Sequence, residues 1–287
     1  MPDYVIRPAT LAEFEIAVDW AAGEGWNPGL DDAPAFYGAD PGGVLMGFLD
    51  GRPVASLTVV RYDANYGFLG FYIVRPELRG TGLGLKIWDA GIRHLGGRII
   101  GLDGVIEQQD NYRKSGFVLS ERNIRYLGRP RPTADAVAGL TVRPFAPDDW
   151  SALAALDRRH VPAPRPAFLE AWIKPEAPET RRTCLVAEQD GDLTGYGVIR
   201  PCNSGYKIGP LFAPNPGIAA SMFSQLTDLT PAGSEIALDT PEVNTAAVAM
   251  AEAAGMEPAF ETARMYKGAM PKLPMGQIFG VTTFELG

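Results

Sequence analysis

Apolar residues in the first third of the chain form three runs of strand length. Residues 44–50 and 54–62 meet at an Asp-Gly pair, which is a strong hairpin turn signal, and residues 68–74 form a continuous apolar run. The pattern therefore predicts a β-hairpin followed by a buried strand.

The hydrophobic period changes directly after the third run. Apolar residues then recur at helical spacing, at Ile87, Trp88, Gly91, Ile92 and Leu95. A buried strand pattern follows at 98–105, a short helix at 110–115 and a final strand at 122–128. These segments predict an α/β fold with a mixed, largely antiparallel sheet flanked by helices, in which one strand leads through a glycine-rich turn into a helix.

The same order of segments occurs twice along the chain. The sequence at 5–8 recurs at 141–144, each time before a polar turn and an amphipathic helical pattern. Four further matches follow in order: 50–51 with 190–191, 102–103 with 238–239, 116–117 with 255–256, and 121–128 with 261–268. All five offsets lie between 136 and 140 residues, which indicates an internal duplication.

A Pro- and Arg-rich stretch after residue 128 indicates where the first copy ends. We place a first domain at 1–130, a linker at 131–140 and a second domain at 141–287. A chain of 287 residues is long enough for two domains that each bury a core.

The composition of the chain excludes some classes of partner and indicates a cellular compartment. The net charge of -8 argues against a nucleic-acid partner or an anionic membrane surface, because both require concentrated positive charge. No apolar stretch approaches the roughly 20 residues that span a bilayer, and the first residues lack the features of a secretory signal, so we expect a cytoplasmic protein. Cys184 and Cys202 belong to no metal-ligand cluster, so neither a metal site nor a disulfide framework is expected.

The glycine-rich turn at Gly80, Gly82 and Gly84 is the strongest chemical signal in the chain. A helix N-terminus presents unpaired backbone N–H groups and the positive end of the helix dipole, and glycine lets an anion approach them closely. The spacing does not fit a Walker A loop. The dinucleotide fingerprint fails too, because its third glycine would fall one position early.

A third kind of phosphate loop does fit. The pattern Val-x-Pro-x-x-Arg-x-x-Gly-x-Gly, at 74–84, resembles the acyl-CoA loop of the GNAT superfamily of N-acyltransferases. The resemblance implies that backbone N–H groups of the loop hold the CoA pyrophosphate, and that backbone groups of Tyr72, Ile73 and Val74 pair with the pantetheine arm. The same strand end would direct an N–H at the thioester oxygen. The loop residues are Arg79, Gly80, Thr81, Gly82, Leu83 and Gly84.

A second segment carries the same resemblance. Residues 112–117 resemble the family's Tyr-x-x-x-Gly-Phe segment, which implies that the hydroxyl of Tyr112 protonates the departing thiolate. The alternative for Tyr112 is a half-buried aromatic residue with a hydrogen-bonded hydroxyl. Val105 and Gln108 stand where the family usually has Asn and Ala.

The second copy lacks these features. Its loop at 214–218 has neither the arginine nor the Gly-x-Gly, and its two prolines remove amides that a phosphate would use. Ala251 aligns with Tyr112. The chain therefore resembles tandem GNAT proteins with one CoA site, in the first domain, and a degenerate second domain that shapes the acceptor site.

Attack by an amine on a thioester requires a proton acceptor. Asp103, at a strand end, and Glu107 are the candidate bases, and a turn or capping carboxylate is the alternative for Asp103. Trp26 and Asn27 are candidate acceptor contacts because their loop borders the acceptor site in this superfamily, and Tyr206 is a third. Packing within its own domain is the alternative for Trp26, and an ordinary strand surface is the alternative for Tyr206.

We therefore expect an N-acyltransferase with acetyl-CoA as cosubstrate and a small primary amine as acceptor, such as an amino acid, an amino sugar or a polyamine. Transfer would be by direct attack in a ternary complex. A protein amino group is the second possible acceptor, and an acyl-CoA sensor without turnover is the alternative from another class. We expect no metal, no nucleic acid and no membrane, and a monomer or homodimer.

Overall fold

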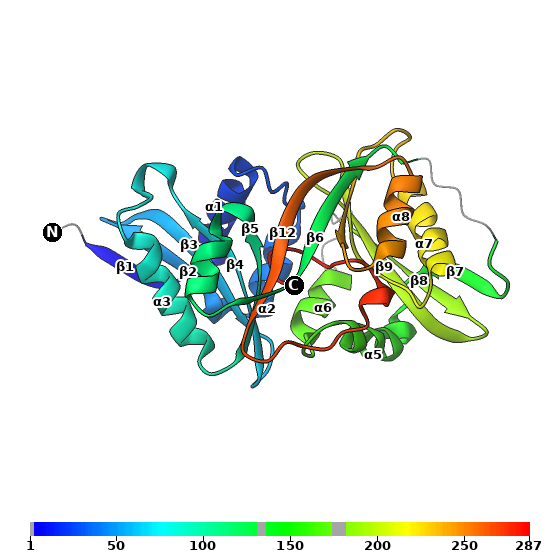
Figure 1. Ribbon diagram of the computed structural model, residues 1–287, viewed down its shortest axis with the longest axis horizontal. Coiled ribbons are helices and arrows are strands. Elements are labelled where there is room, and N and C mark those ends of the chain that lie inside the picture. The colour runs from blue at the N-terminus through cyan, green and yellow to red at the C-terminus, as the bar shows by residue number, and fades with distance from the viewer. Residues whose placement is uncertain (1–2, 131–135, 174–181) are drawn as a thin grey trace.

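The computed structural model describes residues 3–130, 136–173 and 182–287, and the strands in these residues form one continuous sheet. Two similar halves lie side by side along the long axis of the molecule (Figure 1). The linker expected at 131–140 lies partly outside the described residues.

The elements of the first half follow the order expected from the hydrophobic pattern. They are β1 (Tyr4–Pro8), α1 (Leu11–Gly23), α2 (Asp32–Ala39), β2 (Val44–Leu49), β3 (Arg52–Arg61), β4 (Tyr66–Val74), α3 (Leu83–Leu95), β5 (Ile99–Val105), α4 (Gln109–Lys114) and β6 (Val118–Gly128). A capping box between Thr10 and Glu13 starts α1. Positive φ angles of 48° at Asp50 and 78° at Gly51 form the expected hairpin turn.

The second half repeats this order. Its elements are β7 (Leu140–Pro144), α5 (Trp150–His160), α6 (Pro166–Ile173), β8 (Thr183–Gln189), β9 (Asp192–Pro201), β10 (Tyr206–Phe212), α7 (Pro216–Asp228), β11 (Ile236–Pro241), α8 (Thr245–Ala253) and β12 (Glu257–Lys267), and β13 (Ile278–Gly280) follows. The hairpin turn recurs at Asp190 and Gly191 with φ angles of 54° and 89°. The internal duplication is therefore present in the fold as well as in the sequence.

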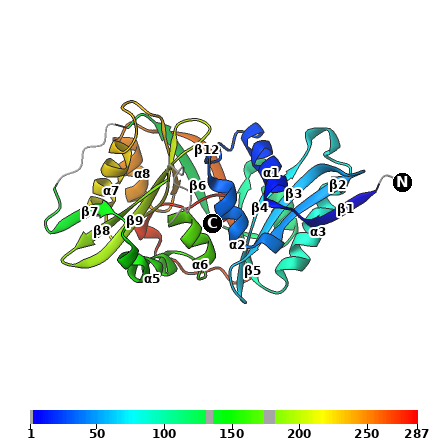
Figure 2. The same ribbon diagram turned by 180° about the vertical axis from the view of Figure 1, so that it is seen from behind.

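Helices cover both faces of the sheet. Helices α3, α7 and α8 lie on the face that is nearest the viewer in Figure 1, and α1, α2 and α6 lie on the face that is nearest in Figure 2. No helix in the described part of the chain is both long enough and apolar enough to cross a membrane.

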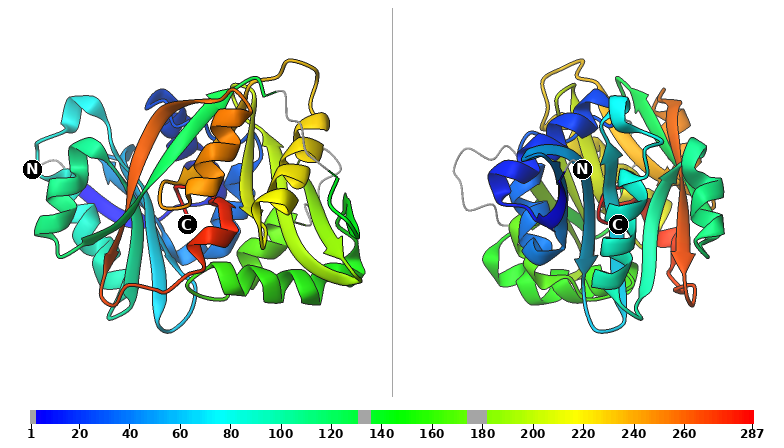
Figure 3. Two further views of the ribbon diagram at one scale, coloured as in Figure 1. Left: turned by 45° about the vertical axis from the view of Figure 1, so that its right-hand side comes forward. Right: turned by 90° about the vertical axis from the view of Figure 1, so that its left-hand side faces the viewer.

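The two halves exchange their last strands. The strand order is β1-β2-β3-β4-β5-β12-β6-β11-β10-β9-β8-β7, so β12 of the second copy inserts between β5 and β6 of the first. Strand β6 in turn pairs with β11, and β6 and β12 run side by side through the middle of the molecule (Figure 3). A cut at residue 130 therefore separates the sequence repeats but leaves β6 in the sheet of the second half.

The halves also share one apolar core. Phe36 on α2 stacks on Trp172 of α6, with ring centroids 5.8 Å apart. Beside this stack, the buried carboxylate of Asp32 pairs with Arg200 at 2.9 Å and with Arg182 at 3.1 Å. Removal of Asp32 would leave the buried Arg200 without its ion-pair partner and Arg182 with Asp31 alone, so this contact fixes the two halves against each other.

The sheet opens between β4 and β5. The two strands pair in parallel only from Tyr66 to Leu69 on β4, yet β4 continues to Val74. A register shift against β3 and a φ of 46° at Phe71 mark a bulge just beyond the last pair. The far part of β4 therefore presents an open edge to the space between the strands.

The equivalent opening in the second half is filled by the chain itself. Strands β10 and β11 pair in parallel only from Tyr206 to Ile208. Beyond that point β13 pairs with β10 at Leu211 and Phe212. The second opening is thus closed by the C-terminal segment, whereas the first has no strand in it among the described residues.

Candidate active site

The glycine-rich loop reaches the open edge of β4. Gly80 and Gly82 have φ angles of 79° and 86°, which few residues other than glycine adopt, and a Cβ at either position would meet no atom within 4 Å. Helix α3 starts directly after Gly82, and no side chain caps it. The free space and the uncapped N–H groups fit a pyrophosphate.

The loop forms one end of a groove. Its walls include the expected residues Tyr72, Ile73, Val74, Arg79, Gly80, Gly82 and Gly84. Thr81 and Leu83 belong to the loop, but their side chains do not line the groove. Arg79 holds the loop against the strand, because its Nε donates to the carbonyl oxygen of Val74 at 2.9 Å and its guanidinium pairs with Glu24.

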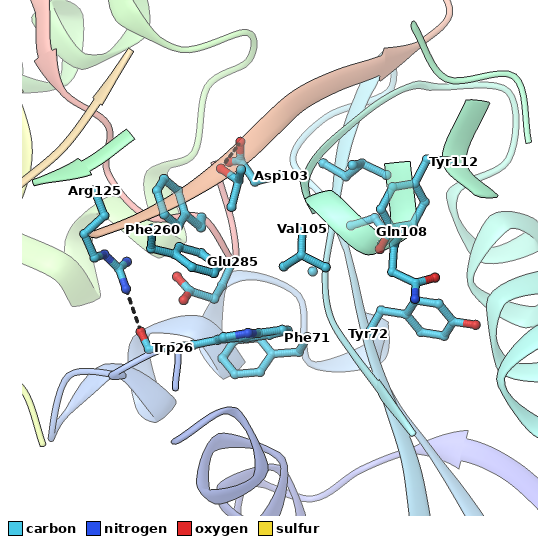
Figure 4. A pocket seen from close by; sticks show the side chains of 15 residues that line it. Trp26, Phe71, Tyr72, Asp103, Val105, Gln108, Tyr112, Arg125, Phe260 and Glu285 are labelled. Atoms are coloured by element: carbon cyan, nitrogen blue, oxygen red, sulfur yellow. Dashed lines mark hydrogen bonds between the residues drawn. The ribbon is translucent and has the colours of Figure 1, made fainter. Parts of the chain in front are cut away.

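The groove continues into a smaller inner pocket at the bulge of β4 (Figure 4). The groove and the pocket are both lined by Trp26, Tyr72, Val105, Gln108 and Phe260. The pocket alone is lined by Leu69, Gly70, Phe71, Leu102, Asp103, Tyr112, Arg125, Thr262, Phe284 and Glu285. An extended molecule that follows the groove from the loop would therefore end at this pocket.

Tyr112 reaches the pocket from α4. Its ring stacks on Trp88, with centroids 5.5 Å apart, and packs against Gly104, where a Cβ would lie 2.7 Å from the ring. Burial raises the pKa of Tyr112 above its ordinary value. The hydroxyl therefore stays protonated at neutral pH and can donate a proton.

Asp103 lines the pocket with its carboxylate already bonded. Arg264 of β12 donates to both oxygens, at 3.1 Å and 2.6 Å, and Asn123 donates to Oδ1 at 2.8 Å. The side chain is 0% exposed. Glu107, the other candidate base, lies exposed on the rim of the groove.

Comparisons with known proteins show the family to which the chain belongs. The "Acetyltransferase (GNAT) family" model matches residues 11–117, and the "Acetyltransferase (GNAT) domain" model matches residues 153–280. The chain is 33% identical over 281 residues to the holothin acyltransferase of Pseudoalteromonas sp. (strain SANK 73390), which covers 98% of this chain and 94% of the relative. The chain belongs to the GNAT superfamily of acyltransferases. Members of this superfamily use acyl-CoA, and this one carries two GNAT domains in tandem.

Solved structures share the fold of this tandem GNAT acyltransferase. A putative acetyltransferase from Pyrococcus horikoshii superposes with a TM-score of 0.82 at 22% identity and covers 99% of this chain and 96% of its own. The tandem GNAT protein from the clavulanic acid biosynthesis pathway gives a TM-score of 0.65 at 15% identity, with 94% and 100% covered. At these identities the likeness concerns the fold alone.

Of the three residues expected to contact the acceptor, the structure places only Trp26 at the pocket. Trp26 lines both the groove and the pocket. Asn27 is next in the sequence, but its side chain is bonded to the backbone of Ser204 and does not line the pocket. Its Nδ2 donates to the carbonyl oxygen of Ser204, and its Oδ1 accepts from the N–H of Ser204, both at 2.9 Å. Tyr206 lies at the start of β10 and packs against the core of the second half, so the structure does not bring it to the pocket.

The pocket also contains residues that the sequence pattern does not point to. Phe260 and Thr262 come from the exchanged strand β12, and Phe284 and Glu285 come from the last residues of the chain. No motif marks them. Their positions follow from the strand exchange and from the path of the C-terminal segment, both of which are long-range contacts.

Proposed function

We propose that this tandem GNAT acyltransferase moves an acetyl group from acetyl-CoA to a primary amine of a small molecule by direct attack in a ternary complex. The continuity of the groove with the inner pocket carries the proposal. A CoA laid along β4 with its phosphates at the glycine loop would place its thioester near the bulge at Phe71. An acceptor in the pocket could then reach the thioester carbon without leaving the protein.

Direct attack is favoured over an acyl-enzyme intermediate. Neither Cys184 nor Cys202 lines the groove or the pocket, and burial raises the pKa of both thiols above the ordinary range. In the proposed reaction the amine nitrogen bonds to the thioester carbon, the C–S bond breaks, and Tyr112 protonates the leaving thiolate. The proton of the amine passes to a base, for which the sequence offers the carboxylates of Asp103 and Glu107.

The walls of the pocket favour a flat and largely apolar acceptor. Trp26, Phe71, Phe260 and Phe284 surround it with aromatic rings, which stack well on planar molecules. Holothin, which the 33% identical relative acylates according to its name, is therefore the first acceptor to test. A protein amino group is less favoured, because strand β12 and the C-terminal residues wall the pocket.

The experiment is a thiol-release assay on the full chain with acetyl-CoA and with longer acyl-CoA donors. The acceptor panel contains holothin, simple aryl amines, an amino sugar, a polyamine and a peptide with a free N-terminus. Calorimetric CoA binding is measured in parallel. We expect turnover with acetyl-CoA and a flat small amine. Absence of CoA binding would contradict the proposal, and CoA binding without turnover on any amine would favour the acyl-CoA sensor.

A further inference from the structure

The C-terminal tail, residues 278–287, runs from the second half of the molecule into the pocket of the first. Its beginning is β13, and the N–H of Val281 donates to the carbonyl oxygen of Asp239 at 2.8 Å. Its end is held from the first half, where the hydroxyl of Tyr62 donates to the carbonyl oxygen of Leu286 at 2.7 Å. The C-terminus therefore lies in the middle of the molecule (Figure 1). Contacts on both sides fix the residues between these points.

The tail passes a glycine in each half. A Cβ on Gly70 of β4 would lie 2.0 Å from the carbonyl oxygen of Glu285, and a Cβ on Gly209 of β10 would lie 2.5 Å from that of Thr282. Gly70 directly precedes the bulge at Phe71. The backbone of Glu285 is therefore in contact with the part of β4 where the groove meets the pocket.

The side chain of Glu285 points into the pocket and is 7% exposed. Its carboxylate lies on the same side of the pocket as Arg125 and Trp26, while Tyr112 and Gln108 lie on the other side, beyond Val105 (Figure 4). Within residues 3–130, 136–173 and 182–287 no hydrogen bond to this carboxylate is found. A buried carboxylate without a bonded partner lowers the stability of the fold, so its position in a pocket indicates a role in binding or catalysis.

The charged groups near Glu285 are bonded to other partners. They are Lys207 on β10, Arg125 on β6, Arg200 on β9 and Asp32 on α2. Arg125 donates to both oxygens of Asp239, at 2.6 Å and 2.7 Å, and Lys207 donates to the carbonyl oxygen of Asn27 at 3.0 Å. Arg200 pairs with Asp32 through its Nε, while its two terminal nitrogens have no hydrogen-bond partner among the described residues. Burial raises the pKa of Glu285 above its ordinary value, and the nearby cations do not offset this effect.

Glu285 is better suited to accept a proton than the two carboxylates that the sequence offers. Both oxygens of Asp103 already accept hydrogen bonds from Arg264. Glu107 lies exposed on the rim. Of the three, Glu285 combines a place in the aromatic pocket with free lone pairs. A carboxylate with a raised pKa is also a stronger base at neutral pH than one in water.

We propose that Glu285 is the catalytic base for the acceptor, so that the C-terminal tail of the degenerate half completes the active site of the first half. This inference rests on the proposed function. As the amine nitrogen bonds to the thioester carbon, its proton passes to the Glu285 carboxylate. The C–S bond breaks on the other side of the carbon, and Tyr112 protonates the thiolate. After the products leave, Glu285 gives its proton to solvent and Tyr112 takes one up from solvent, which restores both groups.

The test compares the full chain with Glu285→Gln, which keeps the shape of the side chain, and Glu285→Asp, which keeps the charge. The acceptor is an aryl amine of low basicity, so that its own ionisation does not produce the acid limb of the rate profile. We expect Glu285→Gln to lower kcat by about 100-fold or more and to flatten the acid limb. CoA affinity should not change. Glu285→Asp should keep a measurable acid limb at a lower rate.

A matched control is Phe284→Leu, which alters the neighbouring wall of the pocket but leaves the carboxylate. It should raise KM for the acceptor and preserve the acid limb. If wild type fails to bind CoA or to turn over, the proposed function fails. If wild type turns over and Glu285→Gln keeps the rate or the acid limb, only the assignment of Glu285 is overturned. Denaturant unfolding of the variants without CoA shows whether activity is lost because the base is missing or because the fold is weakened. If the carboxylate of Glu285 were structural, its neutralisation would lower the free energy of unfolding.

Discussion

The carbonyl oxygen of Glu285 lies 2.0 Å from the point that a Cβ on Gly70 would occupy. These two residues are 215 positions apart in the sequence, since 285 minus 70 is 215. Their contact joins the last residues of the degenerate half to the strand that carries the bulge of the first half. The pocket is therefore complete only when both halves of the chain have folded.

Replacement of Gly70 by alanine should displace the tail. The clash is with backbone, which cannot rotate away, so we expect a loss of about 1–3 kcal/mol in the free energy of unfolding. The rate of acyl transfer should fall as well, because Glu285 moves with the tail. Urea unfolding and steady-state kinetics measure the two effects. Gly97→Ala is the control, because a Cβ at Gly97 would meet nothing within 4 Å. Equal behaviour of the two variants would contradict the prediction.

Replacement of Gly82 by valine should weaken CoA binding by at least tenfold. The valine side chain would project into free space that we assign to the pyrophosphate, and its φ of 86° would be strained. Gly51→Val is a matched control, because Gly51 has a φ of 78° and equally free surroundings but lies in a hairpin turn. Calorimetry should find normal CoA affinity in that variant. An unchanged Kd for Gly82→Val would show that the loop does not hold the phosphates.

Replacement of Tyr112 by phenylalanine should lower kcat by about 100-fold or more and leave the Kd of CoA nearly unchanged, because only the proton donor is removed. The pKa of Tyr112 lies above its ordinary value, so in wild type its deprotonation should not lower the rate below about pH 10. Tyr126→Phe is the control, since Tyr126 packs in the core of the second half. A parallel loss of kcat and CoA affinity would remove Tyr112 as the acid.

Local pattern accounts for most of the elements and for the glycine loop. Strands β2, β3, β4 and β5 and helix α3 lie within a few residues of the segments expected from hydrophobic period and turn chemistry. This agreement has a physical reason, because period and turn preference act over a few neighbouring residues. The positive φ at Gly82 follows from the same local chemistry.

The residues that line the pocket could not be predicted from local sequence pattern. Strand β12 lines the pocket because the two repeats exchange their last strands, and Glu285 lines it because the C-terminal segment crosses to the first half. Two strands with similar hydrophobic patterns give no local signal of which half each will join. Asp103 illustrates the same limit. Its position at a strand end could be expected, but its partner Arg264 comes from the exchanged strand, 161 residues away. Asn27 was expected to contact substrate, and its bonds to Ser204 depend on the packing of the two halves.

Two buried carboxylates at the centre of the molecule should respond to pH in opposite directions. Burial alone would raise the pKa of Asp32, but Arg200, Arg182 and Lys207 outweigh it, so the pKa lies below its ordinary value. For Glu285 burial prevails, and the pKa is raised. Asp32 therefore stabilises the fold above its unfolded pKa of about 3.9, and this stability is lost as the pH falls through its folded pKa. Glu285 instead costs stability as the pH rises from about 4.3 through its raised folded pKa.

At pH 7, Asp32→Asn should therefore lower the free energy of unfolding by about 3–5 kcal/mol, because the buried Arg200 loses its counter-charge and Arg182 keeps only Asp31. Glu285→Gln should leave it unchanged or raise it, because the variant no longer buries an unbonded charge. Urea unfolding of wild type and both variants between about pH 2.5 and pH 8 covers the pH range in which each carboxylate titrates. Glu242→Gln, in the exposed pair with Arg122, should change stability by less than about 1 kcal/mol. A loss of stability in Glu285→Gln as large as that in Asp32→Asn would mean that Glu285 holds the fold together, and its raised pKa would then have no link to catalysis.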